Sequence, residues 1–373
     1  MKIISNNFNQ NLYSTQKLKI SPNFRSKNLI KFSEKSVPAI ITTSMAALGV
    51  VNNPILPIVK TSADVKIQQS FIEKNGLNND YDTDKFFKTF DFEKFGKKGI
   101  PLKYSRNDFL VNIKKLVNNL PIDEQKIILN HFGILITENG FEGLVTNPPF
   151  ENKNVSQNAQ IVVKNISKEA ENFVFKNTII TGDKDADENL TKLIKTFPEL
   201  ITVIGKEQHV THNYSVDIHT FKVLQSAMNH PLYEKLSDES KLVLKTSILL
   251  HDLGKKEKIV DDNHALLSTK YASKILENFP MKEETKSRIT NIIKNHHWFA
   301  SYNQDFTKAE DVVLLCNHPE DILIYIMCAK GDFENVNERF HLKRSNYSKN
   351  QEEFDAYMEN KMKPLVDIYH LIS

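Results

Sequence analysis

The chain has 373 residues, of which 40% are hydrophobic and 25% are charged, which is the composition of an ordinary globular protein large enough for two domains. Its net charge of +3 is too small to indicate binding to nucleic acid or to an anionic membrane surface. The two cysteines, Cys316 and Cys328, exclude a disulfide framework and favour a reducing compartment, so we expect a cytoplasmic protein.

The first 62 residues have the composition of a leader. Residues 1–36 hold seven Lys or Arg and a single acid, Glu34, which favours a disordered arm. The apolar stretch 37–59 is interrupted by proline, glycine and asparagine, whereas a membrane span needs about 20 apolar residues in a row. The basic arm is also long for a secretory signal. We predict a loosely ordered leader over residues 1–62, with a targeting segment as the alternative.

Residues 63–190 show helical periodicity and predict a mostly helical region. Helices are expected over 106–120, 123–132 and 165–175, and a small hairpin over 134–146 around Asn139-Gly140. We find no repeat, glycine-rich phosphate loop or metal-ligand spacing in this region, so its function stays open.

The acidic segment "TGDKDADEN", residues 181–189, could suggest a calcium loop. It lacks the glycine at the sixth position and the terminal glutamate that such a loop requires. We therefore predict that these acids cap the helix expected over 189–197, where the helix dipole favours negative charge.

Eleven of the twelve histidines lie beyond residue 200. From about residue 191 one amphipathic helix follows another, which predicts an all-helical bundle domain over residues 191–373. Five of these helices place a histidine or aspartate on, or beside, the face that should be buried. These residues are His219, His251 with Asp252, His264, His296 with His297, and Asp332.

Any one of these residues is more simply explained as a core polar group with a hydrogen-bond partner. Five such groups together would each cost about 1–3 kcal/mol if left unsatisfied, so one shared divalent cation explains them better. Asp252 should lie in the last turn of a helix that Gly254 ends, where the helix dipole disfavours a carboxylate and a cation would stabilise it. Lys255 and Lys256 could supply part of that charge, but we expect them to be solvated or to reach a phosphate.

The order His219, His251-Asp252 and Asp332 resembles the H…HD…D signature of the HD superfamily of metal-dependent phosphohydrolases, which is an all-helical bundle. Residues 197–225 and "LLHDLGK" are most similar to the HD segment of bacterial uridylyltransferase/uridylyl-removing enzymes, over about residues 193–345. Bacterial tRNA nucleotidyltransferases are a looser match. The chain departs from these relatives because residues 1–190 carry no nucleotidyltransferase motif and because Asp332 follows glycine where alanine is usual.

The resemblance implies a metal-dependent phosphomonoesterase or phosphodiesterase that acts on a nucleotide or nucleotidylylated substrate through a metal-activated water. It implies one metal held by His219, His251, Asp252 and Asp332. A second would share Asp252 and be completed by His264 with His296 or His297. The ion would be Mn²⁺, Fe²⁺, Zn²⁺ or Mg²⁺. By the same resemblance, Asp252, Lys255 and His297 are the candidate catalytic residues, with Lys255 on the substrate phosphate and His297 either a ligand or a proton donor.

Two other functions were weighed. A non-catalytic HD signalling or binding scaffold is the main alternative, and a nucleic-acid-binding accessory domain is disfavoured by the weak net charge.

Trp298 is expected to pack between helices rather than to stack on a base. His212 is expected to cap a helix start, and the basic stretch 338–349 to be a solvated loop, with attraction of a phosphorylated substrate as the other role. The histidines expected at surface or structural positions are His209, His230, His318, His341 and His370. The sequence gives no oligomeric state.

Overall fold

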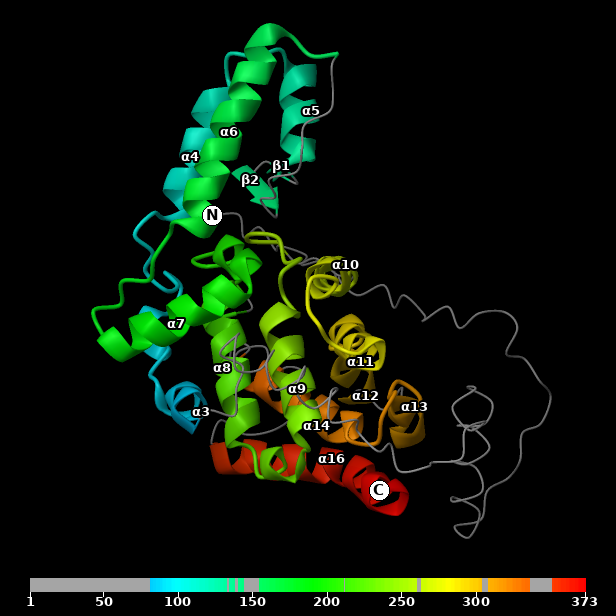
Figure 1. The fold of residues 1–373 in the computed structure, drawn as a ribbon. Helices are drawn as coiled ribbons and strands as arrows, with labels where there is room; N and C mark the ends of the chain where they lie inside the picture. The colour runs from blue at the N-terminus through cyan, green and yellow to red at the C-terminus, as the bar shows by residue number, and fades with distance from the viewer. Residues whose placement is uncertain are drawn as a thin grey trace, which may run out of the picture. The chain divides into compact units, whose positions relative to one another are not determined.

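A computed structural model describes residues 81–132, 134–137, 140–143, 154–210, 212–259, 263–303, 308–335 and 351–373. The predictions for the leader, for the stretch 338–349 and for His341 lie outside these residues. Within the described part, helices predominate and the strands form one two-stranded hairpin, so the predicted mainly helical fold class is confirmed (Figure 1). No helix in these ranges is long and apolar enough to cross a membrane.

The segment 106–175 consists of α4 (Arg106–Val117), α5 (Ile122–His131), the antiparallel strands β1 (Ile134–Thr137) and β2 (Gly140–Gly143), and α6 (Gln157–Phe175). Helix α4 packs on α6, and the rings of Phe109 and Phe173 stack with centroids 4.5 Å apart. Phe109, Ile113 and Val117 recur every fourth residue and are buried, which gives α4 one apolar stripe. The helices predicted over 106–120 and 123–132 and the antiparallel strands of the hairpin are confirmed, while the turn at 138–139 lies outside the described residues. The helix predicted to begin at residue 165 already begins at Gln157.

Helix α7 (Lys184–Thr196) and the 3-10 turn η4 (Pro198–Thr202) follow. Asp183 is the N-cap of α7, and its side chain accepts a hydrogen bond from the backbone N–H of Ala186. Asp187 accepts from the hydroxyl and the backbone N–H of Thr181. The acids therefore cap a helix as predicted, but that helix begins inside the acidic segment rather than after it.

The remaining helices build a bundle. They are α3 (Tyr81–Thr89), α8 (Val216–Asn229), α9 (Asp238–Leu250), α10 (His264–Leu276), α11 (Glu283–Lys294), α12 (Trp298–Asn303), α13 (Ala309–Val313), α14 (Asp321–Glu334) and α16 (Gln351–Ile372), with short 3-10 turns η3 (Glu93–Phe95) and η5 (Tyr233–Lys235). Helices α8, α9 and α14 lie side by side, α11 packs on α9 and α10, and α16 packs on α14 (Figure 1). The predicted helical bundle is thus present.

Helix α14 lies at the centre of this bundle because it is apolar on nearly every side. Every residue from Ile322 to Ala329 is buried. Gly331 allows α14 to approach α8 closely, since a Cβ atom there would lie 2.9 Å from the carbonyl oxygen of Val223. This close contact brings the residue after the glycine, Asp332, towards α8.

Helix α3 also packs against α8, although it belongs to the segment predicted as a separate region. The rings of Phe92 and Phe221 lie 5.2 Å apart, and Lys245 on α9 forms a 2.9 Å ion pair with Asp84 on α3. Residues on both sides of position 190 therefore share a core, and the proposed boundary between residues 190 and 191 stays a prediction.

Candidate metal centre

His219 comes from the first turn of α8 and is fully buried. Its Nε2 atom lies 3.0 Å from Oδ1 of Asp332 on α14 and 3.5 Å from Oδ2 of Asp252. The close packing of α14 on α8 at Gly331 accounts for the first of these distances. Three predicted ligands from three separate parts of the chain thus lie next to one another.

His251 and His296 are oriented in the same way by the backbone. The Nδ1 atom of His251 lies 2.6 Å from the carbonyl oxygen of Ile248, and Nδ1 of His296 lies 2.7 Å from that of Ile293. A carbonyl can only accept, so Nδ1 carries a proton in both rings and Nε2 is the nitrogen left to bind a metal. Burial lowers the pKa of His251, but the neighbouring Asp252 outweighs it and raises that pKa, so a cation at its Nε2 would displace a proton. A histidine that binds a metal through Nε2 commonly has such a partner on its other nitrogen.

The Asp252 carboxylate lies between two groups of histidines. Its Oδ2 atom is 3.2 Å from Nε2 of His251 and 3.5 Å from Nε2 of His219. Its Oδ1 atom is 3.3 Å from Nε2 of His264 and 4.0 Å from Nε2 of His296. Each oxygen therefore faces a different group, which is the arrangement of a carboxylate that could bridge two cations.

Two sets of residues each bring three ligand atoms within 4.8 Å of one another. The sets are His219, His251 and Asp332, and His264, His296 and His297. Atoms that share an ion at about 2.1 Å lie roughly 3–4 Å apart, so both sets have the right scale. The structure thus brings all seven predicted metal-site residues together, and either set could hold a divalent cation; the ligand role of each residue stays a prediction.

Buried nitrogen atoms support a metal at this place. Among the described residues, Nδ1 of His219 has no hydrogen-bond partner, and Nε2 of His219 and of His251 face only carboxylate oxygens. Buried polar atoms are normally satisfied, because leaving one without a partner costs about 1–3 kcal/mol. Imidazole nitrogens together with carboxylates are the donors that borderline divalent metals prefer, so the residues present fit such an ion.

The protonation states also suit a cation. Burial lowers the pKa of His219, and the charge of Lys255 lowers it further, which favours the neutral imidazole that can donate a lone pair. Burial by itself would raise the pKa of Asp252, but the charges of His251 and Lys255 outweigh it and hold that pKa well below its usual value. The carboxylate is therefore ionised at neutral pH.

Lys255 takes part in this charge balance directly. Its Nζ atom lies 2.7 Å from Oδ2 of Asp252 and donates a 2.7 Å hydrogen bond to Oε1 of Gln208. Only 13% of its side chain is exposed, so the expectation that Lys255 is solvated is wrong. Its predicted contact with a substrate phosphate stays a prediction.

Gly254 has a different role from the one predicted. Helix α9 ends at Leu250, so Asp252 lies beyond its last turn, and Gly254 does not adopt the left-handed conformation of a helix-ending glycine. A Cβ atom at Gly254 would lie 2.7 Å from the carbonyl oxygen of His264, and its backbone N–H donates to Oγ of Ser268. The glycine therefore lets α10 approach, and it brings His264 to Asp252.

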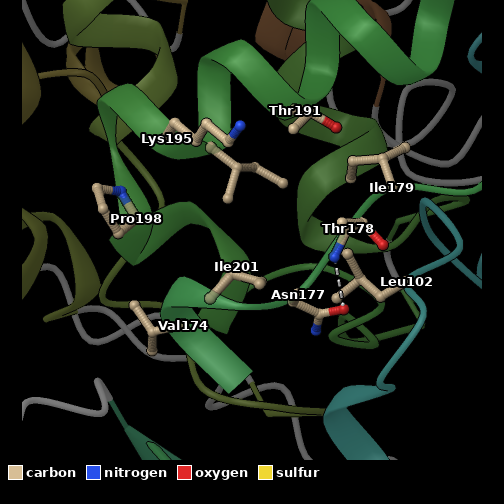
Figure 2. Close-up of a pocket in the computed structure, with 10 residues that line it drawn as sticks. Leu102, Val174, Asn177, Thr178, Ile179, Thr191, Lys195, Pro198 and Ile201 are labelled. Carbon is tan, nitrogen blue, oxygen red and sulfur yellow. Dashed lines mark hydrogen bonds between the residues drawn. The ribbon is translucent and has the colours of Figure 1, made fainter. Parts of the chain in front are cut away.

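Two cavities differ in their relation to the centre. A cavity of about 10 Å³, enough for roughly one water, is lined by His251, His296 and Asp332 together with aliphatic side chains and Cys328. A larger pocket of about 90 Å³ lies between the end of α6, helix α7 and η4, and no histidine or acid lines it (Figure 2). Three of the seven candidate metal-site residues thus line the smaller cavity, and none lines the larger pocket.

The sequence also predicted positions for Trp298 and His212, and the structure confirms the first of these. Trp298 is buried and lies against Tyr302 and Tyr325, so its packing role is confirmed. The N-cap of α8 is Ser215, so the prediction that His212 caps this helix is wrong. The His212 ring instead lies edge-on to the His219 ring at 5.4 Å, where burial and nearby cations lower its pKa to about 2.

Gln208 was missed by the sequence reasoning. An amide gives no ligand or charge signal in a sequence, and its only clue was its place eleven residues before His219 in the segment that resembles HD proteins. Comparisons of this chain with protein-family models, curated proteins and solved structures give no significant match. The geometry and chemistry of the site are therefore the basis for any function of this chain.

Proposed function

We propose that this chain is a metal-dependent phosphohydrolase of the HD type, a phosphomonoesterase or phosphodiesterase acting on a nucleotide or nucleotidylylated substrate. The observation that carries the proposal is the position of Asp252, whose two oxygens face two different groups of imidazoles. The order of these residues along the chain, which resembles the longer HD signatures, supports the HD assignment. The nucleotide part of the proposal depends on that resemblance alone.

A divalent cation bound here would polarise a phosphoryl oxygen and make water a stronger nucleophile at neutral pH. His219, His251, Asp332 and Oδ2 of Asp252 would hold one cation. Oδ1 of Asp252 with the second histidine set would hold another. Nitrogen-rich donors of this kind favour Mn²⁺, Fe²⁺ or Zn²⁺ over Mg²⁺.

Two residues are suited to contact the substrate. Lys255 places an ammonium group beside Asp252, where it would bind an anionic oxygen of the phosphate. His297 is the exposed member of its set, with its ring centroid 4.1 Å from that of His296. That exposure gives a substrate access to His297, which would either complete the metal shell or give a proton to the leaving oxygen.

The test is direct. The full chain is purified, its metal content is measured by elemental analysis, and hydrolysis of bis-p-nitrophenyl phosphate and a nucleotide panel is assayed with added Mn²⁺. Asp252→Ala is measured beside it. We expect metal and turnover in the parent and neither in the variant. A parent that holds no metal and hydrolyses nothing would refute the proposal.

A non-catalytic scaffold is the second candidate, and the Lys255–Asp252 ion pair favours it. That pair supplies a counter-charge to the buried carboxylate from within the chain, without a metal. Absence of turnover on every substrate of the panel, with or without bound metal, would support the scaffold over the enzyme.

A further inference from the structure

We infer that Gln208 is a positioning residue: it holds the ammonium group of Lys255 beside Asp252 so that Lys255 meets the anionic part of the substrate in one fixed place. This inference rests on the proposed function. It assigns a role to a residue that carries no charge and binds no metal.

The ammonium group of Lys255 has two acceptors at equal distance. Oδ2 of Asp252 and Oε1 of Gln208 both lie 2.7 Å from Nζ. An ammonium group has three N–H donors, so two are directed to these oxygens and one is left for an anionic ligand. Two fixed acceptors also remove most of the freedom of a long side chain, which would otherwise be lost on binding.

The amide of Gln208 can be oriented in only one sensible way. Its Nε2 donates to the backbone carbonyl oxygens of Tyr214 and Ser215, at 3.2 and 3.4 Å. These residues immediately precede α8, which carries His219. Reversing the amide would set its NH₂ group against an ammonium and its oxygen against two carbonyls, so Oε1 must face Lys255.

The backbone holds the two partners in register. The buried Lys206 donates from Nζ to the carbonyl oxygen of Lys255 at 2.9 Å. The backbone N–H of Lys258 donates to the carbonyl oxygen of Glu207, the residue before Gln208, at 3.1 Å. Segments 206–208 and 255–258 are therefore joined by two further hydrogen bonds next to the Gln208–Lys255 contact.

A neutral acceptor has an advantage at this position. A cation on Asp252 would repel the Lys255 ammonium and weaken its attraction to the shared carboxylate. A carboxylate in place of the Gln208 amide would also restrain Lys255, but its negative charge would repel the phosphate. The amide oxygen of Gln208 restrains the ammonium without adding negative charge, so the side chain stays available to the substrate.

The test measures binding of inorganic phosphate to the Mn²⁺-loaded full chain by calorimetry. Gln208→Met keeps the size of the side chain but removes the acceptor for Lys255, together with the amide donor to Tyr214 and Ser215. We expect roughly tenfold weaker phosphate binding, the scale of one hydrogen bond to a charged group. Metal content should be unchanged. Glu207→Gln is the matched control, because Glu207 pairs with the exposed Lys258 and not with Lys255, and it should bind phosphate as the parent does.

A double-mutant cycle separates positioning from a general structural effect. Lys255→Met should weaken phosphate binding at least as much as Gln208→Met, and adding Gln208→Met to it should cause no further loss. The inference would be overturned if Gln208→Met weakened phosphate binding equally in the parent and in Lys255→Met, or did not weaken it at all. Gln208→Ala repeats the comparison if the methionine variant has a lowered melting temperature.

The same experiment distinguishes the two proposals. A parent that binds neither metal nor phosphate refutes the proposed function and this inference with it. A parent that binds both and turns over, with Gln208→Met indistinguishable from it in phosphate affinity and KM, refutes the role of Gln208 alone.

Discussion

His219 and Asp332 lie in contact, with Nε2 of one 3.0 Å from Oδ1 of the other, although more than a hundred positions separate them in the chain. They belong to α8 and α14, which pack closely where Gly331 faces Val223. The candidate metal centre therefore depends on a helix–helix contact that involves no ligand atom. This dependence leads to the first prediction.

Gly331→Ala should weaken both folding and metal binding. The added Cβ would lie 2.9 Å from the Val223 carbonyl oxygen, so α14 must move away from α8, and overpacking of this kind costs about 1–3 kcal/mol. Asp332 would move with its helix. Urea unfolding gives the stability change, and calorimetry with Mn²⁺ gives the affinity. Unchanged values for both would show that the helices adjust without moving the ligands.

His219→Ala and His264→Ala should separate the two ligand sets. Each substitution removes one imidazole from only one set, so each variant should keep about half of the metal that the parent holds. Elemental analysis after dialysis measures the stoichiometry. If the two sets together hold a single ion, each variant should instead lose all of its metal.

Asp252→Asn should impair both sets at once, because each oxygen of this carboxylate faces a different set. The amide is nearly the same size but neutral, and we expect metal affinity to fall by about 100-fold or more, since loss of even an outer partner costs 10–100-fold. Asp238→Asn, at the exposed start of α9, is the control and should bind metal normally. Similar metal affinity in the two variants would contradict the bridging position of Asp252.

Removing one partner of the ion pair between Arg106 and Glu257 should destabilise the fold. Arg106 is the first residue of α4, and Glu257 follows the His251–Lys255 stretch of the candidate metal centre. One guanidinium nitrogen of Arg106 lies 2.8 Å from Oε2 of Glu257, and the two side chains are only 6% and 14% exposed. Arg106→Met removes this cation from Glu257, whose side chain is only 14% exposed, and should lower the unfolding free energy by about 1–3 kcal/mol. Arg106→Met with Glu257→Met should cost less, as measured in urea. A larger loss in the double variant would exclude the ion pair as the cause.

Acid should destabilise the fold through His230. Burial, assisted by the charge of Lys330, lowers its pKa to about 4, and its Nδ1 accepts a hydrogen bond from the backbone N–H of Leu232. The folded state thus binds a proton less readily than the unfolded chain, whose histidine pKa is about 6.5. The contribution of neutral His230 to the free energy of unfolding is therefore full above about pH 6.5 and is lost as the pH falls towards 4.

His230→Asn keeps an acceptor near Nδ1 but does not titrate, so its unfolding free energy should fall less between pH 7 and pH 5 than that of the parent. Urea titrations at the two pH values test this. Parallel losses in parent and variant would assign the acid sensitivity to other groups.

The sequence by itself predicted the helical fold class, the hairpin and the set of candidate ligands. Each of these depends on local information: the spacing of apolar residues such as Phe109 and Ile113, and the recurrence of histidine or aspartate at the buried faces of successive helices. Burial of such polar groups requires a partner whatever the details of packing, and for that reason a shared cation could be inferred before any distance was known.

Only the tertiary structure decided how those residues are used. Sequence spacing could not show that α9 ends at Leu250, or that Gly254 allows close helix packing instead of ending the helix. Nor could it show that Gly331 allows α14 to pack closely on α8. Nor could it tell that Lys255 turns back onto Asp252 or that the neutral Gln208 holds it there. These features depend on contacts between segments far apart in the chain, whose geometry follows from the packing of whole helices and not from the residues on either side of each position.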